Sequence, residues 1–395
     1  MSTAPHAWLL TLSALSALAT LSTNILLPAL PVIARSLAID EVRLTAAALG
    51  LFLAVFALAQ LVVGPLSDRL GRRPVVLAGL AVFSIGSAVG AFAMTLPLLL
   101  TGRVLQALGA AAASVLARAA ARDRFEGPQL AALLGRIMVV MAAAPGFSPL
   151  LGGLVEAAAG WRALFATLVL AGLALALAYV RIVGETLPAE RRRQQSAGAL
   201  ARAYFVLLGD ARFMRPALAT AAVLGALFAF FGTAPLVLSH RFGFTALHVG
   251  LFFAATVFIV FAAGQAAPRW TARWGAPTVL RLGATLAIAG GLALLASPGA
   301  GLAGFATAGG IFLFGMGLVS PTGTALALTP FGTQAGQASA LLGFLQMAAA
   351  ALLTTAATTL PGARLDALAA VLTAGGLLAL LSGPARLVAP PTRTP

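Results

Sequence analysis

The sequence predicts an all-α membrane protein with twelve transmembrane helices arranged in two six-helix halves. Three observations predict this class: 61% of the 395 residues are hydrophobic, only 9% are charged, and long charge-free windows recur along almost the whole chain. Because a helix needs roughly 20 apolar residues to cross the hydrocarbon core, nearly all of the chain is expected to lie in a lipid bilayer.

Charge-free windows, and the residues that interrupt them, place the helices in chain order. Those of the first half are expected near 7–33, 44–66, 75–95, 98–117, 131–154 and 163–181. Those of the second half are expected near 216–238, 247–268, 277–297, 302–326, 335–359 and 366–384. Residues 282–363 carry no charge, so the divisions there rest on the turn sequences at 297–299 and 329–332.

The longest polar connection falls between the sixth and seventh helices. We therefore divide the chain into an N-terminal half (1–183), a cytoplasmic linker (184–212) and a C-terminal half (213–395). This layout is typical of transporters built from two similar halves, each of them an inverted repeat of three-helix units.

The basic residues number 25, and all of them are arginine. An even number of helices places both termini on one side, and a cytoplasmic N-terminus puts most of these arginines in cytoplasmic loops, as the positive-inside rule requires. This distribution accounts for the net charge of +15 without a nucleic-acid partner.

The chain has no cysteine, and its three histidines lack metal-ligand spacing. We therefore expect no disulfide, no metal site and no cofactor. A membrane enzyme would need a nucleophile, an acid–base pair or a metal set near the membrane surface, and the sequence offers none of these.

The most specific motif lies between the second and third helices. It consists of six residues at fixed spacing: Gly64, Asp68, Arg69, Gly71, Arg72 and Arg73. Gly71 permits a tight reversal, while Asp68 can pair with Arg69 or with the positive end of a neighbouring helix, a contact that can form in one conformation and break in another. The spacing resembles the G-x-x-x-D-R-x-G-R-R signature of the major facilitator superfamily, and we assign these residues to gating.

The fourth helix contains Arg103 and Gln106, which share one helix face. An arginine inside a membrane helix is costly unless it faces a polar cavity or a partner. The pair is similar to the family's R-x-x-Q-G motif, associated with proton transfer, although Gly109 is displaced by two positions. An arginine that only snorkels to the surface is the alternative.

The fifth helix carries a run of prolines and glycines that resembles the family's G-P-x-x-G-G antiporter motif: Pro145, Gly146, Pro149, Gly152 and Gly153. Proline removes backbone hydrogen bonds and glycine allows close approach, so this segment can bend and pack against a helix of the other half. In the family the motif distinguishes exporters from importers, and a kinked helix without directional meaning is the alternative.

Further phrases are similar to the bicyclomycin- and chloramphenicol-resistance (Bcr/CflA) multidrug efflux transporters, in the drug:proton antiporter branch of the superfamily. They lie at 24–31, 118–123, 160–162, 185–187 and 336–343. The resemblance implies a secondary transporter that exports drugs or similar small amphiphilic compounds by alternating access in exchange for protons, as a monomer in the bacterial cytoplasmic (inner) membrane.

One departure concerns coupling, because Asn24 stands where many members of the group carry aspartate and asparagine cannot titrate. All ten acidic residues fall in loops or near helix ends, so the nearest candidates for coupling are Glu156 and Asp123. A facilitator without proton coupling therefore stays open.

The substrate cavity is expected at the midplane between the halves. Its candidate residues come from both halves: Asn24, Arg103, Gln106, Phe228, Phe231, Gln346 and Met347. A mostly apolar, aromatic cavity suits hydrophobic or cationic compounds. An exporter of sugars, amino acids or other small metabolites is the alternative, and it would need more polar cavity residues. A channel or a non-transporting sensor fits the antiporter-like fifth helix poorly.

Overall fold

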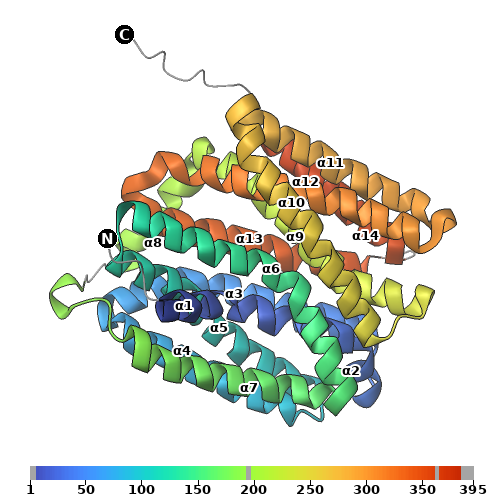
Figure 1. Ribbon diagram of the computed structural model, residues 1–395, viewed down its shortest axis with the longest axis horizontal. Helices are drawn as coiled ribbons and strands as arrows, with labels where there is room; N and C mark the ends of the chain where they lie inside the picture. Colours follow the sequence, from blue (N-terminus) through green and yellow to red (C-terminus); the bar gives the residue numbers. More distant parts are fainter. Residues whose placement is uncertain (1–5, 193–196, 361–363, 384–395) are drawn as a thin grey trace.

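The computed structural model describes residues 6–192, 197–360 and 364–383, and all regular secondary structure in these ranges is helical (Figure 1). Eleven helices or helix pairs there are long and apolar enough to cross a membrane. α6 is a further long helix of 33 residues and packs alongside α1 and α10 in the same bundle. The predicted twelve-helix membrane fold is confirmed.

The helices form two groups, blue to green and yellow to red in Figure 1. The first group contains α1 (His6–Asn24), η1 (Leu27–Ala29), α2 (Leu30–Ser36), α3 (Glu41–Leu70), α4 (Arg72–Ala91), α5 (Leu96–Arg124), α6 (Gly127–Ala159), α7 (Trp161–Ala178) and η2 (Tyr179–Val183). The second contains α9 (Ala211–Phe242), α10 (Ala246–Trp274), α11 (Ala276–Ala296), η4 (Ser297–Ala300), α12 (Gly301–Leu328), η5 (Thr329–Gln334), α13 (Ala335–Thr359) and α14 (Arg364–Ser382). The short turns η4 and η5 confirm the two divisions expected within 282–363.

Equivalent helices of the two halves pack in the same way. α4 lies against α5 and α7, and α11 lies against α12 and α14 in the same order. The main contacts between the halves are also related by this symmetry, since α3 pairs with α13 and α6 pairs with α10. Each half is thus a six-helix unit, and two helix pairs join the units.

Several helices run further than the charge-free windows indicate. α5 continues to Arg124, past the expected end at 117, and α10 continues to Trp274, past 268. Backbone hydrogen bonding is independent of side-chain charge, so a helix can carry its arginines beyond the apolar window. This extension brings charged side chains of α5 onto the inner face of the bundle.

The connection between the halves contains two further helices, η3 (Ala189–Arg191) and α8 (Ala197–Gly209). We expected only a polar connection here, and α8 instead packs an apolar face against the C-terminal half through Leu207, which lies with Phe213 and Leu341 in one cluster. α8 has only 13 residues, too few to cross a membrane, so it gives no transmembrane signal. We call the end of the bundle that carries this connection the linker side, at the left in Figure 1.

On the opposite side, glycines of α6 allow close contact with both halves. A Cβ atom at Gly152 would collide with the carbonyl oxygen of Ile25, at the break between α1 and η1. A Cβ atom at Gly153 would lie 2.6 Å from the carbonyl oxygen of Ala246, at the start of α10. α6 therefore needs glycine to bring the two halves together at this end.

We predict that Gly152→Ala lowers the apparent Tm of the purified protein, corresponding to about 1–3 kcal/mol, because the added methyl group overfills a backbone contact. Gly135→Ala is the matched control on the same helix, since nothing lies within 4 Å of a Cβ atom there. Scanning fluorimetry of both variants in detergent checks the prediction. Equal Tm values would contradict the need for close contact at Gly152.

Candidate transport site

A cavity of about 370 Å³ lies between the two halves. Its wall is largely apolar and includes Phe52 and Phe56 of α3, Leu224 of α9 and Met141 of α6. Hydroxyl and amide groups are interspersed with these side chains: Ser16, Thr20, Thr23, Gln60, Ser114, Ser320, Thr324 and Gln346. The size and mixed lining are typical of pockets that hold small organic molecules.

The predicted cavity residues of the C-terminal half divide into two groups. Phe228, Gln346 and Met347 line the cavity. Phe231 lies behind this wall, where it is 5% exposed and its ring meets the ring of Phe253 edge-on at 5.2 Å. The structure thus assigns Phe231 to the aromatic packing of the C-terminal half instead of the cavity surface.

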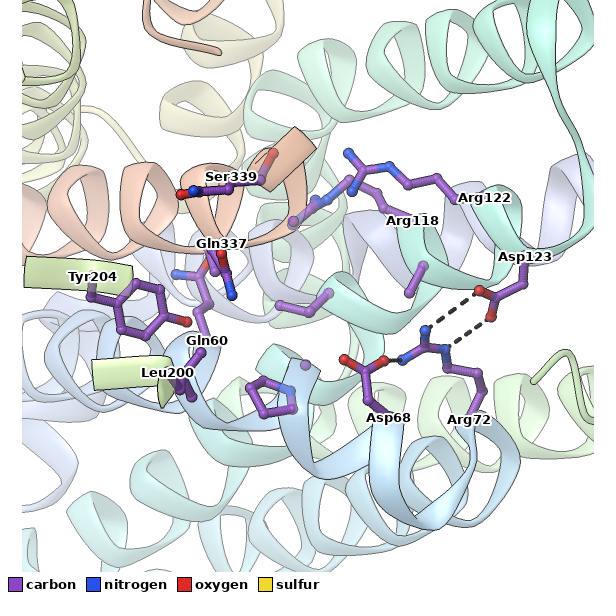
Figure 2. A pocket seen from close by; sticks show the side chains of 17 residues that line it. Gln60, Asp68, Arg72, Arg118, Arg122, Asp123, Leu200, Tyr204, Gln337 and Ser339 are labelled. Carbon is purple, nitrogen blue, oxygen red and sulfur yellow. Dashed lines mark hydrogen bonds and ion pairs between the residues drawn. The ribbon is translucent and has the colours of Figure 1, made fainter. Parts of the chain in front are cut away.

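The cavity continues toward the linker side into a second hollow of about 350 Å³. The two share Gln60, Arg118, Arg122 and Ser339 in their walls, so they form one path. Figure 2 shows the second hollow between the N-terminal half and the first turns of α13. On the opposite side, the imidazole Nε2 of His240 lies 2.7 Å from a carboxylate oxygen of Glu41, which adds to the glycine contacts between the halves. The structure therefore has its cavity connected to the linker side.

Arg72 is the centre of an ion-pair network at the mouth of this path (Figure 2). Its guanidinium donates to Asp68 at 2.6 Å, to the Ser67 hydroxyl at 2.5 Å and to Asp123 at 2.9 Å. The hydroxyl of Thr186 also donates to Asp123 at 2.9 Å. The structure thus brings Asp68 and Arg72 of the gating motif together with Asp123, which we had considered only for coupling.

The remaining residues of the gating motif play different parts. The side chains of Arg69 and Arg73 are exposed, and Gly64 lines the second hollow. Gly71 has φ +99° and joins α3 to α4, and a Cβ atom there would lie 2.6 Å from a carboxylate oxygen of Glu185. Glycine is therefore required at this turn for both conformation and space.

Glu185 anchors this turn, a role that we did not infer from the sequence. Its carboxylate accepts from the backbone N–H groups of Arg72 at 2.9 Å, Arg73 at 3.2 Å, Thr186 at 3.0 Å and Leu187 at 2.9 Å. Burial opposes ionisation, but these four donors outweigh it and hold the pKa of the Glu185 carboxyl below its usual value. The only sequence signal was its place in the family-like phrase 185–187.

Arg103 is fully buried and does not line the cavity, although we predicted it there. Its guanidinium donates to the Ser22 carbonyl at 3.0 Å, to the Ala48 carbonyl at 3.4 Å and to the Gln106 side chain at 3.0 Å, and it lies 4.3 Å from the ring centroid of Phe52. The snorkelling alternative is therefore wrong. Arg103 joins α1, α3 and α5 by donating to backbone oxygens of the two other helices.

Gln106 and Asn24 are likewise buried outside the cavity wall. The Gln106 amide donates to the Ser87 hydroxyl at 2.9 Å, which extends the Arg103 network to α4. The side-chain amide of Asn24, at the end of α1, has no hydrogen-bond partner among the described residues. Glu156, near the end of α6, is partly buried and its carboxylate has no partner in the described part of the chain.

Two residues that line both hollows, Arg118 and Arg122, were missing from our cavity prediction. We assigned them to a basic loop because the fourth window ends at 117, but α5 carries them inward. Their spacing from Ser114, at i+4 and i+8, places all three on one helix face and was a signal that could have identified them. A cationic substrate would need an anionic group in the wall. The only acids that line either hollow are Asp68 and Asp123, and both bind Arg72.

The described residues contain no group of three or more His, Asp or Glu side chains that could hold a metal ion.

We predict that Arg103→Ala lowers both folded yield and transport, because each hydrogen bond to this charged group contributes about 1.5–3 kcal/mol and the links from α5 to α1 and α3 would be lost. The yield and flux of Arg103→Lys should lie between those of the parent and the Ala variant. An ammonium group keeps the charge but cannot donate to α1 and α3 with the planar geometry of a guanidinium. Detergent-solubilised yield and flux in proteoliposomes measure both effects. Leu108→Ala, at an exposed position of the same helix, is the control. Parent-like yield and flux from the Ala variant would refute this role.

We predict that Glu185→Gln lowers the apparent Tm at neutral pH and that the difference in Tm between variant and parent becomes smaller at acidic pH. A carboxyl whose pKa is lowered in the folded state stabilises the protein fully at pH values above its ordinary pKa of 4.5. That stability is lost as the pH falls through the lowered pKa. Scanning fluorimetry across this pH range tests the prediction, with Glu190→Gln at an exposed position as the control. A difference that stays constant into acid would argue against the anchoring carboxylate.

Comparison with known proteins agrees with this architecture. A family profile described as Major Facilitator Superfamily matches residues 12–354. The chain is 35% identical over 291 residues to a chloramphenicol resistance protein of Pseudomonas aeruginosa, covering 73% of this chain and 68% of that protein. It is 29% identical over 378 residues to multidrug resistance protein D of Escherichia coli (strain K12), covering 94% of each chain. The crystal structure of the human organic anion transporter MFSD10 (TETRAN) has the same fold, with a TM-score of 0.68, 19% identity, and 95% and 98% of the two chains covered. The chain belongs to the major facilitator superfamily.

Proposed function

We propose that this protein exports drugs or similar small amphiphilic compounds by alternating access, in exchange for protons. The observation that carries the proposal is the cavity between the halves, which is connected to the linker side while glycine contacts join the halves on the opposite side. A site that is reached from one side at a time is what alternating access requires. The relatives named for chloramphenicol and multidrug resistance support the substrate class.

The proposed direction follows from the arginines of the loops. Their concentration on the linker side supports a cytoplasmic location for the linker and both termini, in the inner membrane of a bacterium. In that orientation the cavity of this structure would receive its substrate from the cytoplasm. We propose that the protein acts as a monomer, because one chain contains both halves and the whole cavity.

Proton coupling would need a carboxylate that changes partners during the cycle. Asn24 cannot provide it, and Asp123 is held by Arg72 and Thr186. Glu156 has no partner among the described residues and lies close to Gly153, whose contact with Ala246 joins the two halves and must open when the cavity turns to the other side. We therefore propose Glu156 as the residue that exchanges protons.

Uptake of chloramphenicol into proteoliposomes tests the proposed function. An acidic lumen should accelerate uptake by the parent, because outward proton flow drives inward drug movement. Glu156→Gln should keep uptake in the absence of a gradient and lose the acceleration. Asp366→Asn, at an exposed position near the start of α14, is the control and should behave as the parent.

Each outcome has a distinct meaning in this assay. Uptake by the parent that ignores the gradient would make the protein a facilitator without proton coupling. Acceleration retained in Glu156→Gln would eliminate Glu156 as the coupling residue. Protein that takes up no chloramphenicol under either condition would contradict drug export.

A further inference from the structure

One face of α5 presents two arginines to the path between the central cavity and the linker side. Arg118 and Arg122 are spaced i, i+4 and line both hollows, and Ser114 precedes them by one turn on the same face. In Figure 2 both side chains extend into the hollow toward Ser339 and Gln337 on α13. Both guanidinium groups therefore face the space through which a substrate would pass.

These two charges have no carboxylate partner in the described part of the chain. Arg118 donates to the Ser114 hydroxyl at 3.4 Å, which is a neutral and long contact. The acids nearest in the wall, Asp68 and Asp123, both bind Arg72 at the mouth of the path. All ten acidic residues of the chain are described, and none of them lines the central cavity. The central cavity thus has two fixed positive charges and no fixed negative charge.

Arg118 is partly buried, and withdrawing a guanidinium from water is costly unless an anion or an acceptor approaches it. Guanidinium groups bind carboxylate, sulfonate and phosphate oxygens through paired donors, which adds both strength and orientation. The rings of Phe52, Phe56 and Phe228 line the central cavity but not the second hollow, and they suit an apolar body. The central cavity therefore combines two cationic groups, which it shares with the second hollow, with an apolar aromatic surface of its own.

We propose that the compounds this protein transports are amphiphilic organic anions, whose charged group binds Arg118 and Arg122 while the apolar part contacts the phenylalanines. The proposal rests on the proposed transport function and specifies its substrate class. It replaces the expectation of cationic compounds, which would meet two like charges here. A neutral compound that carries hydrogen-bond acceptors is accommodated more weakly by the same groups.

Three naphthalene compounds that differ in charge test the proposal by binding to the purified protein in detergent. They are 2-naphthoate (anion), 2-naphthylmethanol (neutral) and protonated 2-naphthylmethylamine (cation), and calorimetry gives the Kd of each. The parent should bind the anion at least about tenfold more tightly than the cation, since a charge-assisted hydrogen bond is roughly twice as strong as a neutral one and the cation is repelled. Equal affinities, or tighter binding of the cation, would overturn the proposal.

Variants of α5 assign the preference to the two arginines. Arg118→Gln and Arg122→Gln should each weaken 2-naphthoate binding by about tenfold and change 2-naphthylmethanol binding less than twofold, while Arg122→Lys should retain part of the affinity. Arg124→Gln removes an exposed arginine that lies outside both hollows and should match the parent. Unchanged anion affinity in both Gln variants would overturn the assignment. If these variants do not fold, the comparison of the three compounds on the parent still decides the substrate class.

Two further experiments distinguish this proposal from lipid binding and from a failure of the transport function. In the first, short-chain phosphatidylglycerol is added as a competitor for bound 2-naphthoate. If the lipid displaces 2-naphthoate at a concentration equal to or lower than that at which unlabelled naphthoate does, the arginines bind a lipid headgroup instead. Binding does not depend on flux. Anion-selective binding without flux in proteoliposomes would contradict only the proposed transport function. Chloramphenicol flux without anion-selective binding would contradict only the proposal that the substrates are organic anions.

Discussion

Close helix contact through glycine is the constraint on which this bundle depends, because a bilayer gives two apolar helices no hydrophobic gain for coming together. A Cβ atom at Gly86 of α4 would lie 2.7 Å from the Gly102 carbonyl oxygen of α5. At the equivalent pair in the other half, a Cβ atom at Gly290 of α11 would lie 2.8 Å from the Ala308 carbonyl oxygen of α12. The same solution therefore stabilises both halves.

Three arginines of α5 illustrate two ways of placing a cation in an apolar bundle. Arg103 donates through Nε and Nη1 to carbonyl and amide oxygens from three helices, so it acts as a structural connector, although its Nη2 has no partner among the described residues. Arg118 and Arg122 face a cavity and receive no comparable set of acceptors from the described residues. The first arrangement stabilises one half, whereas the second leaves donors for a molecule that comes from outside.

The sequence was sufficient for the fold and insufficient for the cavity wall. Apolar windows and turn residues locate the helices because both depend on local chemistry. Which side chains line the cavity depends on the rotation of each helix about its axis, and an apolar window does not show this rotation. For this reason Arg103 and Phe231 were expected to line the cavity, although both lie behind its wall. Arg118 was missed for a second reason: a charge ended the predicted helix at 117, but the helix hydrogen bonds continue to Arg124. The role of Glu185 was equally hidden, since two of its four backbone donors belong to a turn more than a hundred residues away in sequence.

The two arginines of the central cavity also bear on the energy source of the cycle. An anion that leaves a cell with a negative interior moves down the electrical gradient, which releases about 2.3 kcal/mol per charge for each 100 mV. Export of such a compound would be electrogenic, and exchange for a proton would add to the same driving force, because both movements carry positive charge inward. A transporter that binds anions with fixed arginines can therefore be driven by voltage even where its cavity wall contains no titratable carboxylate.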